Sequence, residues 1–340
     1  MGATQAVDLP ITQPRTLQGP ADAVVIDNAT VKFGDQLAVN GVSFAVPSGT
    51  ILGLIGPSGA GKTTTIRLMT GALEPTSGSV EVLGENPRSF SSRTRSRIGY
   101  MPQALTLFAD LTCKENVDFV GSLFGMVFRS RRRRTREALE LVDLWDVRDR
   151  RASRLSGGMQ RRLELACALV HDPAMLFLDE PTAGLDPLLR EHVWQELHRL
   201  RRDGRTIVVT TQYLNEAEAC DLVALVAEGR LIAFATPDDL RRQAMGGDIL
   251  EVETVAMFDG ELLKDLPLIR DIRQHGPRRL RITVDDAGSA TPDVVAAVER
   301  HGGQVGSARE ERPSFDEVFA VLVERERARA REARAEGEDK

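Results

Sequence analysis

The chain has 340 residues, of which 42% are hydrophobic and 28% are charged, and its formal net charge is −6 at pH 7. Since this length is about twice that of a typical single domain, we expect one large domain and one small one. The mild acidic balance gives no support for nucleic-acid binding by bulk charge, since proteins that bind nucleic acid concentrate positive charge. Cys113, Cys167 and Cys220 form no C-x-x-C pair, which argues against a disulfide framework or a zinc site and favours a reducing compartment.

Neither a transmembrane helix nor a secretion signal is expected. No stretch approaches the roughly 18 consecutive apolar residues of a membrane span, and the most apolar candidate, residues 119–128, contains two glycines. The N-terminal residues MGATQAVDLP lack the charged-then-apolar pattern of a signal peptide. We therefore expect that the chain does not cross a membrane by itself.

The first two thirds of the chain follow the pattern of an α/β domain. Residues 1–22 are polar and contain several prolines, and we expect them to be a disordered arm. Strand-like runs occupy residues 23–55, and a helix is expected over residues 62–73. Residues 111–154 have a mostly helical pattern, and short apolar strands then alternate with helices over residues 174–229. Strands that alternate with helices indicate a parallel sheet covered on both faces.

The pattern changes near Asp238, where we expect a small appended α+β domain. Its expected strands and helices lie within residues 249–255, 278–284, 291–302 and 314–323. The last residues, 324–340, alternate charge with alanine and indicate either an exposed helix or a disordered tail. No internal repeat is visible, so the chain carries one copy of its site.

The strongest motif is GPSGAGKT, Gly56–Thr63, which lies between an apolar run and a helical pattern and fits G-x-x-x-x-G-K-[ST]. Gly59 and Gly61 permit backbone conformations in which successive N–H groups face one anion. The start of the helix adds its positive end. Lys62 can reach the β- and γ-phosphates, and the Thr63 hydroxyl can bind Mg²⁺. The motif predicts a nucleoside triphosphate site, and a glycine-rich turn without function is the weaker alternative.

A second motif, AMLFLDE, is an apolar strand that ends in the carboxylates Asp179 and Glu180. Because side chains alternate across a strand, the two carboxylates should have different roles. Asp179 suits the surroundings of the Mg²⁺ ion, as a Walker-B aspartate does. Glu180 is then free to orient and polarise the attacking water. An exposed pair of charges at the end of a strand is the alternative.

A third motif, RLSGGMQRRLELACALV, has helical spacing and places Ser156, Gly157 and Gly158 at the start of the helix. A serine and two glycines at a helix N-terminus can bind an anion. Taken alone, this segment is equally consistent with an ordinary capped helix.

In order and spacing, these motifs and the AGLD sequence at Ala183–Asp186 resemble those of ABC-type ATPases, over roughly residues 23–236. The resemblance implies a P-loop ATPase core with an antiparallel β subdomain and a helical subdomain. It also implies that two such domains pack head to tail, with each ATP between one subunit's phosphate loop and the Ser156–Gly158 segment of the other. A chain with one copy therefore needs a second ATPase subunit, most simply itself as a homodimer.

Several residues correspond to family positions one by one. Phe33 matches the aromatic residue that stacks on adenine, although a core strand residue is the alternative. Gln103 matches the glutamine that contacts Mg²⁺ and senses the membrane partner, and Asp186 matches a loop residue at the dimer interface. Met159 replaces the glutamine that commonly follows LSGG, which leaves the backbone anion site intact. The expected ATP contacts are Phe33, Gly56, Pro57, Ser58, Gly59, Ala60, Gly61, Lys62, Thr63, Thr64 and Gln103, and the expected Mg²⁺ ligands are Thr63, Gln103 and Asp179.

The largest departure from the family is Gln212, which stands in the place of the switch histidine in TIVVTTQYLNEA. An amide can donate a hydrogen bond to a phosphate oxygen and accept another. It cannot become cationic near pH 7 as histidine can. Either Gln212 contacts the γ-phosphate and, with Glu180, serves catalysis, or hydrolysis is slow and the glutamine acts as a brake.

The TTQYL sequence and the C-terminal extension, which contains PSFDEVF at Pro313–Phe319, are similar to those of daunorubicin-resistance-type multidrug exporters. This resemblance implies an ATP-hydrolysing subunit on the cytoplasmic face of the membrane, held there by separate ABC-2 type permease subunits. It implies no nucleic-acid partner. The expected domains are the arm at 1–22, the ABC ATPase domain at 23–237, the accessory α+β domain at 238–323 and the charged tail at 324–340.

Two other functions are weaker. Soluble ABC-type mechanical ATPases that act on ribosomes or DNA usually have two ATPase domains or a long coiled-coil insertion, and this sequence has neither. A Rossmann oxidoreductase has no place for Lys62, Thr63 or the LSGG helix. The basic run Arg129–Arg136 could meet anionic lipid headgroups, but a solvated helix start is the favoured interpretation.

Overall fold

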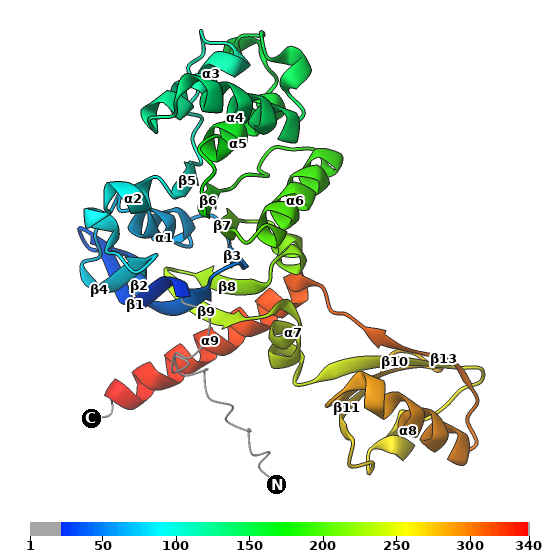
Figure 1. Ribbon diagram of the computed structural model, residues 1–340. Coiled ribbons are helices and arrows are strands. Elements are labelled where there is room, and N and C mark those ends of the chain that lie inside the picture. Colours follow the sequence, from blue (N-terminus) through cyan, green and yellow to red (C-terminus); the bar gives the residue numbers. More distant parts are fainter. Residues whose placement is uncertain (1–21, 339–340) are drawn as a thin grey trace. The chain divides into compact units, whose positions relative to one another are not determined.

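The computed structural model describes residues 22–338 (Figure 1). The expected disorder of residues 1–22 falls almost entirely outside the described residues. The chain divides into two compact units. The first contains the residues up to Ile51 together with Gly61–Thr210 and Glu228–Arg230, and the second contains Leu52–Ala60, Thr211–Ala227 and the residues from Leu231 onward.

The first unit contains an antiparallel sheet of three strands, β1 (Asp22–Phe33), β2 (Gln36–Pro47) and β4 (Ser77–Val82), in the order β2-β1-β4. Along β1 and β2, buried positions with apolar side chains alternate with more exposed positions, which is typical of a sheet with one face in the core. The sequence analysis missed β4, because SGSVEV has few apolar residues and a glycine. This sheet is the expected antiparallel β subdomain.

Three further strands of this unit, β5 (Ile98–Met101), β6 (Met175–Asp179) and β7 (Thr206–Thr211), lie side by side and run parallel. All residues of β6 and β7 are buried, as expected for parallel strands covered on both faces. Since parallel strands end at the same edge, Asp179 and Thr210 meet at the carboxyl ends of β6 and β7, where their Cα atoms are paired.

Helix α1 (Lys62–Met69) follows the glycine-rich loop, and it ends four residues before the expected end at residue 73. Gly71 causes the early end, because its φ of 74° lies in the left-handed region that favours glycine. A side chain there would also place its Cβ 2.2 Å from the carbonyl oxygen of Pro87.

The expected helical segment contains α3 (Cys113–Leu123), α4 (Phe128–Leu141) and, after the LSGG motif, α5 (Gly157–Leu169). Arg129–Arg136 forms the start of α4, where Arg136 pairs with Glu140 at 2.7 Å. This agrees with the solvated helix start that the sequence favoured. The remaining helices of the unit are η1 (Pro87–Ser89), α2 (Ser92–Arg95), η2 (Trp145–Val147), η3 (Ala152–Arg154) and α6 (Pro187–Arg202).

The second unit contains most of β3 (Ile51–Ile55), which leads into the glycine-rich loop and runs parallel to β8 (Leu222–Ala227). Strand β9 (Arg230–Ala235) follows β8 in the chain. The segment between β7 and β8 forms a short 3₁₀ helix, η4 (Leu214–Ala219), where the sequence suggested a helix.

The C-terminal part of this unit is the expected α+β fold. Its antiparallel sheet has the order β11 (Ile269–Gln274), β12 (Arg279–Val284), β10 (Asp248–Thr254) and β13 (Val305–Glu311). Leu250, Ile282 and Val294 form part of a core that the strands share with helix α8 (Ala287–Arg300). The sequence missed β11 and β13, whose residues IRDIRQ and VGSAREE are mostly polar. The elements are α7 (Pro237–Met245), β10 (Asp248–Thr254), η5 (Gly260–Leu263), β11 (Ile269–Gln274), β12 (Arg279–Val284), α8 (Ala287–Arg300), β13 (Val305–Glu311) and α9 (Phe315–Glu338).

Helix α9 continues to Glu338 and so includes most of the charged end. For residues 324–340 the sequence allowed either a helix or a disordered tail, and the structure has the helix up to Glu338. Within residues 22–338, no helix combines the length and the apolar character that a bilayer span requires.

Candidate functional site

The glycine-rich loop connects β3 to α1 and depends on glycine at three positions. Gly59 and Gly61 have φ values of 79° and 100°, in the left-handed region that other residues rarely adopt. At Gly56, a Cβ atom would lie 2.0 Å from the carbonyl oxygen of Val226 on β8. The backbone N–H of Gly56 also donates to the carbonyl of Thr211 at 3.3 Å. These three glycines therefore determine the shape that the motif requires of a phosphate-binding loop.

Helix α1 begins at Lys62 without a side-chain cap, because the residue before it is Gly61, and no acidic residue lies in its first turn. The positive end of the helix is therefore not neutralised by its own side chains. Lys62 is only 5% exposed. Burial lowers the pKa of its ammonium group, and the carboxylates of Glu180 and Asp179 oppose this change. The predicted phosphate-binding lysine thus lies among the predicted carboxylates.

Asp179, at the end of β6, is fully buried and accepts two hydrogen bonds on one carboxylate oxygen. The hydroxyl of Thr63 donates to Oδ1 at 3.2 Å, and the hydroxyl of Thr210 donates to the same atom. Oδ2 of Asp179 is buried and has no hydrogen-bond partner within the described chain. A buried carboxylate oxygen without a partner, beside a threonine hydroxyl, fits the oxygen ligands that Mg²⁺ prefers.

Glu180 has a left-handed backbone conformation, with a φ of 54° that is unusual for a residue other than glycine. Its backbone N–H donates to both the carbonyl and the hydroxyl of Thr210, at 3.1 and 3.0 Å. Its carbonyl accepts from Arg161 at 2.8 Å. Backbone strain of this kind persists where surrounding contacts hold it, and it is common at functional sites. The backbone therefore leaves the extended conformation of β6 at Glu180.

Arg161, on α5, is a functional candidate that the sequence analysis missed. Its guanidinium donates to the carbonyls of Asp179 and Glu180 at 2.7 and 2.8 Å, and to the carbonyls of Pro102 and Gln103, both at 3.0 Å. It also forms a buried ion pair with Glu164 at 2.9 Å. Arg161 therefore connects the helix of the LSGG motif to the backbone of Asp179 and Glu180 and to the loop that contains Pro102 and Gln103, which we call the glutamine loop.

The pKa of the Glu164 carboxyl is raised by burial, against hydrogen bonds from the Thr106 backbone and the charge of Arg161. The sequence signal for Arg161 was weak, because this residue is the first of two adjacent arginines and only its burial distinguishes it from Arg162. An arginine at the third position after Gly158 was the available clue.

Four other expected site residues lie at the ends of strands or at the starts of helices. Phe33 ends β1 with about half of its surface exposed, and Gln103 is exposed after β5. Ser156 caps α5, with its hydroxyl accepting from the N–H of Met159 at 3.3 Å. Asp186 is exposed and caps α6 by accepting from the N–H of Leu189 at 3.0 Å. Within residues 22–338, none of these four side chains takes part in the hydrogen bonds described around Asp179.

Gln212 follows the last residue of β7 and is exposed. The next residue, Tyr213, donates its backbone N–H to the hydroxyl of Thr211 at 3.0 Å, and η4 begins immediately afterwards. The expected position of Gln212 at the carboxyl end of a buried strand is therefore correct, and its side chain is accessible to a ligand.

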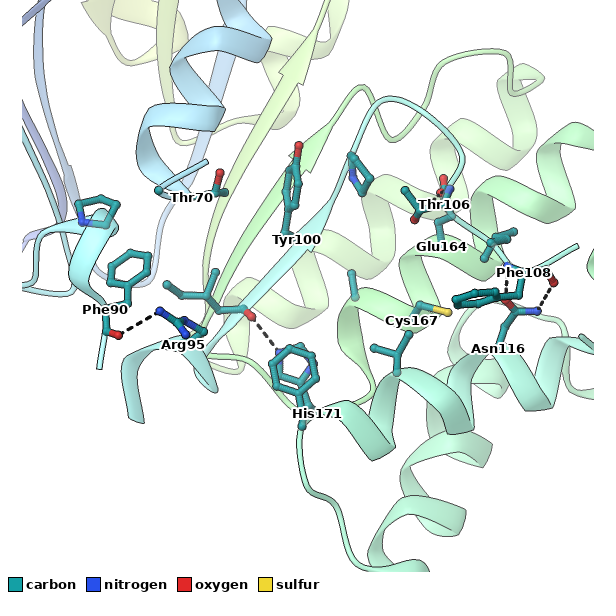
Figure 2. A pocket seen from close by; sticks show the side chains of 18 of the residues that line it. Thr70, Phe90, Arg95, Tyr100, Thr106, Phe108, Asn116, Glu164, Cys167 and His171 are labelled. Atoms are coloured by element: carbon teal, nitrogen blue, oxygen red, sulfur yellow. Dashed lines mark hydrogen bonds between the residues drawn. The ribbon is translucent and has the colours of Figure 1, made fainter. Parts of the chain in front are cut away.

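A pocket of about 400 Å³ lies in the first unit next to the glutamine loop (Figure 2). Its wall includes aromatic rings on several elements, and Phe124 stacks on His171 with ring centroids 3.6 Å apart. Burial lowers the pKa of His171, whose Nε2 lies 2.9 Å from the carbonyl oxygen of Ile98. The pocket is lined by residues at the end of α1, after η1, on β5, α3 and α5, and in the loop around Gln103. Among them are Thr70, Phe90, Tyr100, Pro102, Thr106, Phe108, Asn116 and Glu164.

Residues 39–183 match the protein family described as ABC transporter, and residues 236–323 match the C-terminal domain of ATP-binding proteins like DrrA1-3. The daunorubicin resistance ATP-binding protein DrrA3 of Streptomyces coeruleorubidus is 38% identical over 302 residues, which cover 88% of this chain and 96% of that protein. The probable multidrug ABC transporter ATP-binding protein YbhF of Escherichia coli (strain K12) is 42% identical over 231 residues, or 67% of this chain. The chain spans 40% of the length of YbhF.

Among solved structures, a dimeric post-hydrolysis state of the ATP-binding cassette MJ0796, bound to ADP and Pi, superposes with a TM-score of 0.58. It is 28% identical and covers 63% of this chain and 98% of its own. The expected P-loop ATPase fold and the resemblance to daunorubicin-resistance-type ATPases are both confirmed. The chain therefore belongs to the ATP-binding proteins of ABC transporters, and its C-terminal domain is of the DrrA type.

Proposed function

We propose that this chain binds and hydrolyses ATP and thereby powers an exporter whose transmembrane subunits are separate chains. The observation that supports this most is the grouping of Lys62, Thr63, Asp179 and Glu180 by the contacts described above. This set provides a cation for the phosphates, a hydroxyl and a carboxylate for a metal ion, and a carboxylate for the water. We also propose that residues 23–237 form the ATPase domain and residues 238–323 the accessory domain.

In this proposal, the ATP phosphates lie against the N–H groups of Gly56–Thr64, with adenine against Phe33 and the γ-phosphate near Gln103 and Gln212. Thr63, Asp179 and Gln103 would hold Mg²⁺, which would neutralise negative charge on the phosphates. Glu180 accepts the proton of the water that attacks the γ-phosphorus. The bond to the β–γ bridging oxygen breaks, and ADP and phosphate are released.

The Ser156–Gly158 segment is proposed to act on the ATP of a second copy, in a head-to-tail homodimer with Asp186 at the interface. Its backbone N–H groups, at the start of α5, suit a γ-phosphate that reaches them from outside the subunit. The dimeric MJ0796 cassette supports this arrangement by similarity.

The pocket beside Gln103 is the proposed docking site for a cytoplasmic helix of an ABC-2 type permease. Pro102 and the exposed side chain of Phe108 line it, and Leu105, between them in the chain, is also exposed. Arg161 bonds to the carbonyls of both Pro102 and Glu180, so a change at the pocket reaches the hydrolytic carboxylate through one side chain. Such docking would place the chain on the cytoplasmic face of the membrane, and no nucleic-acid partner is proposed.

The cargo is proposed to be a drug or another lipophilic compound, since the names of DrrA3 and YbhF refer to daunorubicin resistance and multidrug transport. Affinity isolation of the chain from gently solubilised native membranes tests this function. We expect a stoichiometric polytopic membrane protein to accompany it. Recovery with ribosomes or DNA instead would contradict the exporter proposal and support the soluble mechanical ATPase.

Replacing Gln212 with alanine should slow ATP hydrolysis if the amide contacts the γ-phosphate. One hydrogen bond to a charged group contributes ~1.5–3 kcal/mol, so the expected fall in kcat is about 10- to 150-fold. Phosphate release at saturating ATP measures this change. An unchanged rate would rule out the γ-phosphate contact, and a faster rate would identify the glutamine as a brake.

A further inference from the structure

Arg241, on α7, is a buried arginine for which the proposed chemistry gives no role. Its guanidinium contacts two other segments of the second unit. It forms an ion pair with Glu218 on η4, and its Nε donates to the carbonyl of Pro313 at 3.2 Å. Its Cζ lies 4.6 Å from the centroid of the Phe315 ring, and Asp238 on α7 itself accepts from Nη1 at 3.0 Å.

The two segments that Arg241 joins have different places in the chain. Pro313 and Phe315 belong to PSFDEVF, at the start of α9, and Phe315 is only 2% exposed. Glu218 belongs to η4, which begins two residues after Gln212. A second bond, from Arg325 on α9 to the carbonyl of Gln243, also ties α9 to α7.

The residue after η4 packs on the strand that leads to the phosphate loop. Cys220, which follows η4, is buried, and a Cβ atom on Gly53 of β3 would lie 2.6 Å from its sulfur. The 212–220 segment is therefore in contact with β3 through Cys220 and with α7 through Glu218. Cys220 and Glu218 therefore hold the same end of η4 from two sides, one against β3 and the other against α7.

We propose that Arg241 is a positioning residue for Gln212, through which the C-terminal domain sets the rate of ATP hydrolysis. When PSFDEVF is seated, Phe315 and the Pro313 carbonyl hold the guanidinium. The guanidinium holds Glu218 and with it η4, the short helix that begins two residues after Gln212. Displacement of α9 releases this contact and lets Gln212 leave the γ-phosphate. The inference rests on the proposed function of Gln212 and adds a means of regulation to it.

The chemistry of arginine suits this position better than that of lysine. The planar guanidinium can stack on an aromatic ring while its N–H groups bond to three separate oxygens in fixed directions. Glu218 and Asp238 supply two carboxylates for one buried cation. Loss of the arginine leaves the carbonyl of Pro313 and the exposed Glu218 carboxylate without this link, while the Phe315 ring stays in its core.

The test compares four variants of the full chain: Arg241→Gln, Glu218→Gln, Arg242→Gln and Arg241→Gln combined with Gln212→Ala. Arg242 is the matched control, because it is the next arginine on α7 and pairs with Asp248 at 2.9 Å instead of with η4. Glu218→Gln breaks the same ion pair at its exposed partner. Because this substitution is at the surface, it tests the ion pair even if Arg241→Gln, at a buried position, impairs folding. The readouts are kcat for ATP hydrolysis and the Kd of ATP.

We expect Arg241→Gln and Glu218→Gln each to lower kcat roughly five- to tenfold, at the lower end of the usual coupling between sites, with the ATP Kd unchanged. In the Gln212→Ala background, Arg241→Gln should change kcat less than about twofold, because residues that act as a unit are not additive. Arg242→Gln should leave kcat at the native value.

An equal fall of kcat in the native and Gln212→Ala backgrounds would overturn the inference, as would a parallel loss of ATP affinity or an equal effect of Arg242→Gln. If Arg241→Gln lowers kcat but Glu218→Gln does not, Arg241 acts through packing and not through the ion pair, and the inference is also overturned. A native chain that hydrolyses no ATP would instead contradict the proposed function together with the inference that rests on it. Native hydrolysis that Arg241→Gln leaves unchanged contradicts the inference only.

Discussion

Replacing Glu180 with glutamine is expected to stop repeated turnover of ATP while ATP binding is retained. The amide has almost the same size, and the backbone of residue 180 remains bonded to Thr210 and Arg161. It cannot accept the proton of the attacking water, however, and a positioned general base contributes about 10²- to 10⁴-fold to a rate. Steady-state phosphate release should fall by this factor.

The same variant should make the ATP-bound dimer persist, since hydrolysis no longer separates it. Light scattering with and without Mg²⁺ and ATP measures this as a lasting doubling of mass. The control is Glu191→Gln, an exposed carboxylate on α6, which should leave turnover at the native rate. Turnover of Glu180→Gln within a few-fold of native would exclude Glu180 as the base.

The second large effect is expected for Lys62→Ala, which should weaken ATP binding by about 10- to 150-fold, the worth of one hydrogen bond to a charged group. The ammonium group is buried, and its charge lies close to the carboxylates of Asp179 and Glu180. Its loss leaves these carboxylates without a cation and adds their repulsion to the phosphates. Calorimetric titration with Mg²⁺ and ATP measures the change in Kd.

Two comparisons make the Lys62 result specific. Lys264→Ala removes an exposed ammonium far along the chain and should leave the Kd unchanged. Lys62→Arg keeps the charge, but its wider, forked group must enter a buried position, so affinity should fall as well. Native affinity in Lys62→Ala would show that the ammonium does not contact the phosphates.

The sequence predicted the phosphate-loop environment well because each part of it is local. Strand β3, the glycines with positive φ and the start of α1 are consecutive, so their geometry follows from residue type and spacing. The apolar run before Asp179 similarly predicted a buried strand, and the structure brings Asp179 to Thr63 across 116 positions of sequence. In this case the strand order of the fold, rather than local spacing, completes the site.

The contacts that were not predicted are long-range and polar. Arg161 and Arg241 each lie within runs of arginines that have no distinguishing pattern, and only the folded chain shows which one is buried. Thr210 was part of an apolar strand pattern, and its bond to Asp179 depends on the register between β6 and β7. The edge strands β11 and β13 were missed because an exposed strand lacks the apolar alternation on which such predictions depend.

The left-handed conformation of Glu180 has a consequence for evolution and for engineering. A non-glycine residue held there stores on the order of 1–3 kcal/mol of strain. Glycine, or to a lesser degree asparagine, would relieve that strain. Selection for heat resistance alone therefore favours replacement of the carboxylate that we propose as the general base. This position opposes stability to activity, and any stabilising library for this protein should leave it fixed.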